Sequence, residues 1–271
     1  MAMPPPLPDE LWWTILMALP TGRDVARAAF LCPGAARMCR RMWAVRGMFF
    51  TGKLGAPPQR YAAIVAPGGD GTQLARAVAR CPAGSAILVR GAQGDNGGAN
   101  IRFERRVSLF GEDGASVAAT LFVPSAATYP PEQAVPFGDN EVCLVRLALG
   151  RVLSPAALRI RGCTLRGVTS YGAWSSARIT QCTFRHGADH AVHFAGYALI
   201  VERCIFEGAS QAEPRAVGIA VTFTHGGGVT VANNTFRDEW SALKIDAQFR
   251  DALHFGPNEY DRCAHKILSD V

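Results

Sequence analysis

A short phrase that recurs through the second half of this 271-residue chain constrains its fold more than any other feature. Its template is an apolar residue, any residue, an apolar residue, two residues of any kind, Cys or Asn, any residue, and a bulky apolar residue. Four copies and a weaker fifth follow one another at 158–165, 177–184, 199–206, 229–236 and 253–260. The Cys or Asn positions lie 19, 22, 30 and 24 residues apart. Self-similarity at such a period is typical of folds in which equivalent units stack on one another.

The template predicts three columns of equivalent side chains, with one residue from each repeat. Two columns are apolar and would fill the interior: Ile160, Ile179, Val201, Val231 and Phe255 in one, and Leu165, Phe184, Phe206, Phe236 and Tyr260 in the other. The third would line an inner bend and contains Cys163, Cys182, Cys204, Asn234 and Asn258. At such a bend an Asn side chain can bond the backbone of a neighbouring coil, and a Cys can fill space.

A second set of segments lies between the copies, at 191–194, 219–223 and 242–246. Apolar residues alternate there with small or polar ones, as in a strand with one buried face. Two strands per repeat predict a coil that stacks on the next, and we expect six or seven coils. Upstream, 73–80 predicts a short helix, 86–89 and 106–110 predict strands, and the Pro-rich segment 124–140 predicts a long loop.

The first 50 residues have helical periodicity instead. Leu11, Ile15, Leu16 and Leu19 recur at helical spacing, and two further helical stretches are predicted over 24–31 and 35–46. The following segment is rich in Gly, Pro and Ala, a composition that breaks regular structure. We therefore expect a helical segment over 1–50, a linker over 51–70 and a β-rich domain over 71–271.

Composition narrows the class of protein. A hydrophobic content of 49% with 18% charged residues fits a globular chain. No run reaches the roughly 18 apolar residues that a membrane span needs, and the N-terminus lacks the pattern of a secretory signal, so we expect a cytoplasmic or nuclear protein. None of the eight cysteines is in a C-x-x-C pair, so we expect no metal, and a reducing compartment argues against disulfides. The net charge of +6 comes mostly from scattered arginines, which a GC-rich genome explains better than a nucleic-acid footprint does.

Two upstream tracts carry a resemblance to a known fold. The tract 84–91 (GSAILVRG) and the tract 101–111 (IRFERRVSLFG) resemble the opening coils of the right-handed parallel β-helix family of pectate-lyase type. In that family a capping helix precedes the first strand, and a V-x-L-x-G phrase follows one coil later. The resemblance covers residues 70–265. It implies a mainly β fold, a right-handed single-stranded parallel β-helix, preceded here by a small N-terminal α-helical segment.

The N-terminal segment resembles an F-box. Leu7-Pro-Asp-Glu-Leu11 matches its opening L-P-x-E-L, and Leu31-Cys32 matches a later V-C, whereas the Trp expected about four residues on is Ala36. F-boxes bind the Skp1 adaptor of cullin–RING ubiquitin ligases, and the rest of the chain usually selects the client. The resemblance implies a Skp1-binding stripe of Leu7, Pro8, Leu11, Ile15, Leu16 and Leu19. The alternative is an amphipathic helix packed on the β-helix, since apolar spacing alone fits both.

One outward column of the second strand set, His193, Thr222 and Lys244, is a candidate ligand face together with Asp246 beside it. Ala195 and Thr224 lie beside it, and Asp189, His190 and His225 lie in nearby turns. The alternative is an ordinary solvated sheet face. Glycoside hydrolysis requires paired carboxylates, and Asp246 beside Lys244 lacks a second one. A further outer column of Ala191, Ala220 and Ala242 would be covered by a loop or a partner.

These observations favour a non-catalytic adaptor without cofactors, which binds Skp1 and an unknown client. One alternative is a polysaccharide-binding or polysaccharide-cleaving β-helix protein, and another is a structural component of a viral particle. Giant DNA viruses encode many F-box proteins, so the cell in question would be a eukaryotic host. A homo-oligomer is also considered, because the open ends of a β-helix can pair. Neither nucleic acid nor a membrane is expected as a partner.

Overall fold

The computed structural model describes residues 61–124, 141–172, 175–187, 190–208, 216–224, 228–246, 248–249 and 253–270. Within these ranges the protein is mainly β, and all recorded strand pairs are parallel. The helices described with both ends are α4 (Thr72–Arg80) and the 3₁₀ helix η1 (Asn96–Gly98), and residues 248–249 are also 3₁₀-helical. No described helix is both long enough and apolar enough to cross a membrane. The expected F-box-like helices and the Skp1-binding stripe lie outside the described residues.

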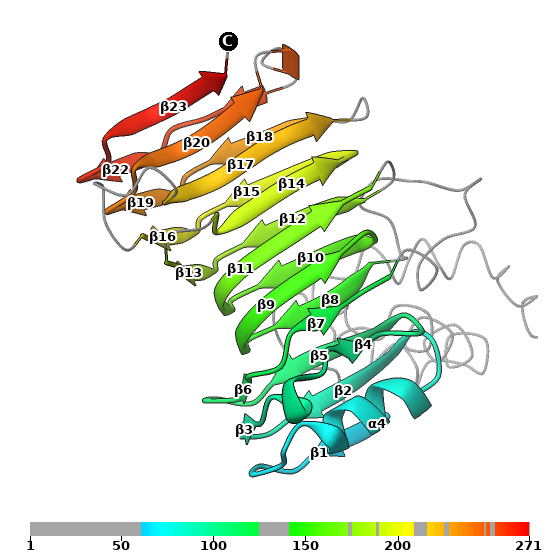
Figure 1. Ribbon diagram of the computed structural model, residues 1–271. Helices are drawn as coiled ribbons and strands as arrows, with labels where there is room; N and C mark the ends of the chain where they lie inside the picture. The colour runs from blue at the N-terminus through cyan, green and yellow to red at the C-terminus, as the bar shows by residue number, and fades with distance from the viewer. Residues whose placement is uncertain are drawn as a thin grey trace, which may run out of the picture.

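The first sheet takes one strand from each successive coil (Figure 1). Its nine strands are β1 (Ala63–Val65), β2 (Ser85–Val89), β5 (Val107–Gly111), β8 (Val142–Val145), β10 (Ala157–Arg161), β12 (Ser176–Thr180), β15 (Ala198–Glu202), β18 (Val229–Ala232) and β21 (Leu253–Phe255). Their order in the sheet is their order in the chain, so each coil lies on the preceding one. Nine strands exceed the six or seven coils expected, because the sequence pattern did not predict β1, which lies inside the expected linker, or β8, which follows the Pro-rich segment. The loop predicted over 124–140 lies almost entirely outside the described residues.

The second sheet has fourteen strands in two limbs. Its members are β3 (Ala92–Gln93), β4 (Ile101–Arg102), β6 (Ser116–Val117), β7 (Leu121–Phe122), β9 (Ala148–Ser154), β11 (Thr164–Tyr171), β13 (Thr183–Arg185), β14 (Val192–Gly196), β16 (Ile205–Glu207), β17 (Val217–Thr224), β19 (Thr235–Arg237), β20 (Ser241–Asp246), β22 (Glu259–Asp261) and β23 (His265–Asp270). The long strand β11 joins the limbs, because its start pairs with β13 and its end pairs with β14. Later coils use separate strands for the two limbs, β13, β16, β19 and β22 in one and β14, β17, β20 and β23 in the other.

A regular coil therefore has three strands, where the sequence predicted two. The repeat phrase itself holds two strands, which a corner residue with positive φ separates. Gly162 (φ 60°), Gln181 (φ 56°), Arg203 (φ 55°) and Asn233 (φ 58°) occupy this corner in successive coils. The amide of Gln181 donates to the carbonyl oxygen of Glu202 at 3.1 Å, and the amide of Arg203 donates to that of Ala232 at 3.3 Å. These bonds pair the backbone amides of the turn with carbonyls of the next coil, so the chain can turn within one copy of the repeat phrase without leaving those amides unpaired.

The two interior columns predicted from the repeats are confirmed. Cα register pairs Ile160 with Ile179, Ile179 with Val201, Val201 with Val231 and Val231 with Phe255. The aromatic column is in register as well, and its rings stack with centroids 4.8 Å apart for Phe184 and Phe206 and 4.7 Å apart for Phe206 and Phe236. The three phenylalanines are fully buried. A dry ladder of this kind places each coil's apolar residues against the next coil's, which is the main stabilising contact of a stacked fold.

At the inner bend, Asn side chains bond the backbone of a neighbouring coil, as predicted for the third column. The side-chain oxygen of Asn234 accepts the amide hydrogen of Cys204 at 2.9 Å, and its side-chain nitrogen donates to the carbonyl oxygen of Val201 at 3.0 Å. Asn258 repeats both contacts one coil further on, with the amide of Asn234 and the carbonyl of Val231. Where Cys replaces Asn, the buried thiols of Cys163, Cys182 and Cys204 are free and lie near backbone carbonyls instead.

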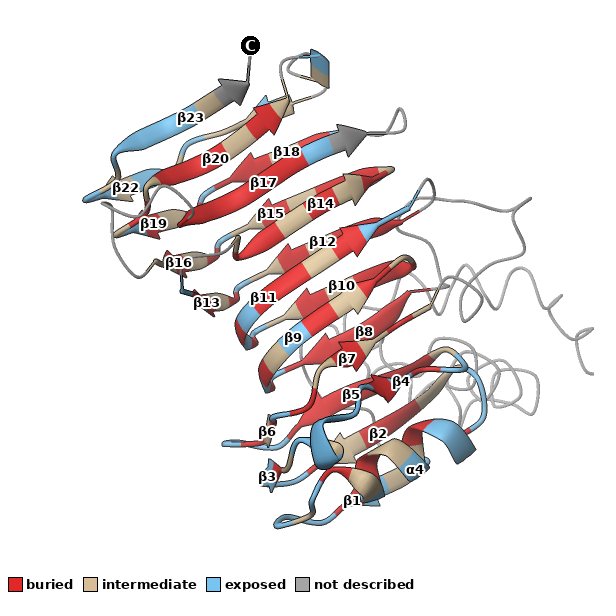
Figure 2. Ribbon diagram, viewed as in Figure 1, coloured by how far each residue is buried: buried red, intermediate tan, exposed pale blue. Residues whose placement is uncertain are grey.

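The two ends of the stack differ. At one end, α4 lies against β1, β2 and β4 and buries Leu74 and Val78 completely (Figure 1). At the other end, β21, β22 and β23 form the last coil, and β23 is largely exposed in Figure 2. The interior is thus closed by a helix at one end only, among the residues described.

Candidate functional site

The candidate ligand face lies on the limb formed by β11, β14, β17 and β20. Side chains alternate along each strand: in β14 the interior holds Val192 and Phe194, and His193 points outward between them. In β20 the interior holds Leu243 and Ile245, so the neighbouring Lys244 and Asp246 face outward. The sequence predicted the correct faces for these residues.

The register of this face differs from the predicted column. His193 lies opposite Ala220 rather than Thr222, and Ala220 in turn lies opposite Lys244. A β-bulge after Phe194 inserts one extra residue into β17, which a reading of alternation alone could not detect. The side chains still meet, because Nε2 of His193 lies 3.2 Å from Oγ1 of Thr222. Burial lowers the pKa of His193, so the neutral imidazole is favoured here.

Lys244 and Asp246 are placed less closely. Lys244 lies two strands from His193, which corresponds to about 10 Å at the usual strand spacing. Both oxygens of the Asp246 carboxylate are engaged locally, because they accept hydrogen bonds from the backbone and side-chain nitrogens of Gln248 at 3.3 and 3.1 Å. The structure therefore joins His193 to Thr222, and Asp246 serves the turn that follows β20.

The surroundings of the face are partly as expected. The ring of His190 stacks on that of His193 with centroids 5.5 Å apart. Asp189 and His225 lie outside the described residues. The predicted alanine column is wrong, because Ala220 shares its register with His193 and Lys244 and not with Ala191 and Ala242. All three alanines are buried.

Sequence reasoning missed one residue of this region. Cα register places Asp270 directly opposite Asp246, on the adjacent strand β23. The two positions are 24 residues apart, which is the length of the last repeat interval. Counting 24 residues on from Asp246 reaches Asp270, so the repeat interval alone could have identified this second acidic residue.

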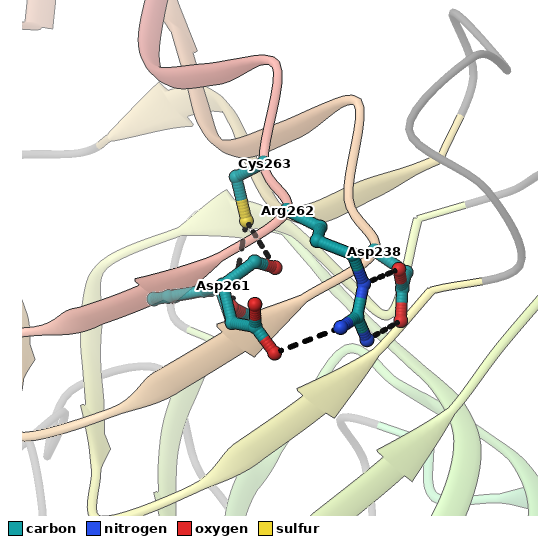
Figure 3. A network of polar contacts seen from close by, with 5 residues as sticks. Asp238, Asp261, Arg262 and Cys263 are labelled. Atoms are coloured by element: carbon teal, nitrogen blue, oxygen red, sulfur yellow. Dashed lines mark hydrogen bonds and ion pairs between the residues drawn. The ribbon is translucent and has the colours of Figure 1, made fainter.

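The ion pair between Arg262 and Asp238 ties two coils together at a different corner. Figure 3 shows Arg262 donating from its guanidinium to both carboxylate oxygens of Asp238, at 2.6 and 2.8 Å, with Asp261 at 3.4 Å. The hydrogen bond from Arg262 is the main cause of the lowered pKa of Asp238. Asp238 and Arg262 both have positive φ, so they are corner residues of successive coils. This exposed network, with Cys263 beside it, joins the last two coils and therefore has a structural role.

A buried pair lies nearby. Nε2 of His186 is 2.6 Å from Oε1 of Glu239, and both side chains are almost inaccessible to solvent. Desolvation by burial raises the pKa of Glu239, although the contact with His186 opposes the shift. A side chain at Gly208 would come within 2.9 Å of the other Glu239 oxygen, so the close packing of this corner requires glycine. The pair links two coils across 53 residues of sequence.

Within the described ranges, no group of three or more His, Cys, Asp and Glu side chains is placed to hold a metal ion. Comparison with known proteins found no matching family model, no matching curated protein and no matching solved structure. Chemically, the face presents an imidazole, a hydroxyl and an ammonium group on adjacent parallel strands. It is a hydrogen-bonding surface.

Proposed function

We propose that this protein is the substrate-recruiting adaptor of a Skp1–cullin–F-box ubiquitin ligase in the cytoplasm or nucleus of a eukaryotic host cell. In this proposal residues 1–50 form the F-box-like segment, and the stacked parallel strands are a right-handed β-helix that binds the client protein. The observation that carries the proposal is the phrase Leu7-Pro-Asp-Glu-Leu11, placed ahead of a long stack of parallel coils.

The stack has the properties that a client-binding scaffold needs. Its columns of buried residues fix the strands, so the outward side chains are held in a constant geometry and lose little entropy on binding. The limb that carries His193 and Thr222 also exposes Tyr171, whose accessible fraction is 41% and which lies in register with Ala195. An exposed aromatic residue among polar ones is the usual anchor of a protein–protein contact.

The decisive experiment is capture of Skp1 by the full chain. Recombinant Skp1 should bind the 271-residue protein, and the triple substitution Leu7→Ala, Pro8→Ala and Leu11→Ala should abolish binding. The matched control is Leu54→Ala, Pro57→Ala and Pro58→Ala, which removes the same residue types from the segment 51–70. Thermal unfolding of each variant reports whether the β stack is intact. Absence of binding by the intact chain, or equal binding by the two triple variants, contradicts the proposal.

A second candidate is favoured by one observation, the register of Asp246 with Asp270. Adjacent strands are about 4.8 Å apart, so the Cα register of these two residues is compatible with the carboxylate separation of retaining glycosidases, about 5 to 5.5 Å. We therefore keep polysaccharide binding or cleavage as the alternative. Incubation with polyuronides and neutral glycans, with calcium present, tests it. Cleavage that is lost in both Asp246→Asn and Asp270→Asn would favour this alternative over the adaptor.

A further inference from the structure

The last coil of the stack has strand edges with no described neighbour on one side. Within the described ranges, β21 is the terminal strand of the first sheet, and β22 and β23 are the terminal strands of the two limbs of the second. β21 and β22 have three residues each, whereas β23 has six and lacks proline. Because an edge strand offers a row of unpaired backbone groups, β23 is the edge best able to accept another strand.

The interior is also open at this end. Ile267 continues the column that runs through Ile219 and Leu243, both of which are fully buried, yet 40% of its own surface is exposed. Phe255 and Tyr260, the last members of the two repeat columns, are only partly buried. The coil therefore presents apolar side chains at positions that are buried in the preceding coils. Figure 2 shows the difference in burial, because β23 is largely pale blue whereas β20 is mostly red.

We propose that the β23 edge of one copy of this chain pairs with the β23 edge of a second copy, which joins two stacks end to end about a two-fold axis. At the opposite end of the described stack, α4 covers the interior, with Leu74 and Val78 packed inside. Two identical strands related by a two-fold axis run antiparallel. The contact is then isologous and closes on itself, so it gives dimers and not fibres.

The sequence of β23 selects one register. In an antiparallel pair, directly opposed residues point to the same face. Positions 267 and 269 are in register with the interior residues Leu243 and Ile245, so they must lie opposite each other or opposite themselves. Centring the axis on Leu268 satisfies this requirement and pairs all residues from Lys266 to Asp270. It sets Lys266 of each copy opposite Asp270 of the other, which gives two opposite-charge cross-strand pairs. Charge complementarity with itself is the reason to commit to a second copy as the occupant.

A charge-swap series tests the inference on the full chain. Sedimentation velocity from about 1 to 200 µM should show a monomer–dimer equilibrium, since a small contact of this kind gives weak association. Lys266→Asp sets like charges opposite each other twice per dimer and should raise the dissociation constant at least about tenfold. The double variant Lys266→Asp with Asp270→Lys should restore dimerisation. Arg166→Asp, which makes the same charge change at an exposed position on the internal strand β11, should leave it unchanged.

Circular dichroism and thermal unfolding confirm that each variant keeps the β stack. A monomer at every concentration overturns the inference. So does a dimer that tolerates Lys266→Asp, or one that the double variant fails to restore. None of these outcomes depends on Skp1 binding, so the inference and the proposed function are tested separately.

Discussion

The Asn ladder at the inner bend permits a quantitative prediction for Asn234→Ala. Asn234 is 1% exposed, and its side chain bonds the amide of Cys204, the carbonyl of Val201 and the side chain of Asn258. Removing it leaves the buried amide of Cys204 without this acceptor, which costs about 1 to 3 kcal/mol. The other two lost bonds add roughly 1 kcal/mol in total, because water reaches Asn258. We expect the free energy of unfolding to fall by about 3 kcal/mol.

Two variants at the same bend control for side-chain identity and burial. Asn258→Ala removes the equivalent side chain one coil further on, where the residue is only partly buried, and should cost about 1 kcal/mol because water replaces the lost contacts. Asn234→Cys installs the residue that the preceding coils use, and its cost should lie between these values. Urea unfolding, followed by circular dichroism and fluorescence together, measures all three. A loss for Asn234→Ala no greater than that for Asn258→Ala would refute the ladder argument.

Three further predictions address the core, the thiols and the buried pair of His186 and Glu239. The ring of Phe206 is fully buried between the rings of Phe184 and Phe236. In the same denaturation assay, Phe206→Ala should therefore lower the free energy of unfolding by about 3 to 5 kcal/mol, and Phe206→Leu should lower it by less. Burial raises the pKa of the Cys163 and Cys182 thiols, so a thiol reagent at pH 8 should label both only after the protein unfolds. Cys263 is partly exposed and should be labelled earlier, and peptide mass spectrometry measures the order of labelling. The raised pKa of Glu239 means that its contribution to stability is present below its ordinary value of 4.5 and is lost as pH rises through the folded value. Glu239→Gln should flatten the stability–pH curve above pH 4.5 in thermal unfolding, and an unchanged slope would contradict this assignment.

The repeat phrase alone was enough to predict the interior columns. Its apolar positions recur in a fixed relation to the Cys or Asn residue, so the alignment of Ile179 with Val201 and of Phe184 with Phe206 followed directly. The phrase did not reveal that it holds two strands. The bend depends on a positive φ at Gln181, Arg203 and Asn233, and none of these residue types requires that conformation. β1 was missed because it lies in a segment rich in Gly, Pro and Ala, and β8 was missed because Leu147 stands where the other copies of the phrase have Cys or Asn.

The candidate face was predicted in part. Alternation along a strand is a local property, so the outward direction of His193 and Lys244 could be inferred. Register between strands depends on how many residues each coil contains and where a bulge falls. For this reason the sequence predicted that His193 and Thr222 lie close together but not that Ala220 is the residue in register between His193 and Lys244. The juxtaposition of Asp246 and Asp270 needed the same information.

The sequence by itself determined the chemistry of each position along a coil, because burial in a strand is dictated by the apolar or polar character of alternate residues. It also determined that equivalent coils stack, since the repeated columns have no other way to bury their aromatic rings. Only the tertiary structure decided which residues from different coils face each other, and which end of the described stack lacks a covering helix. Those features depend on turn conformations, a bulge and the position of one helix, which act between segments that are a full coil or more apart in sequence.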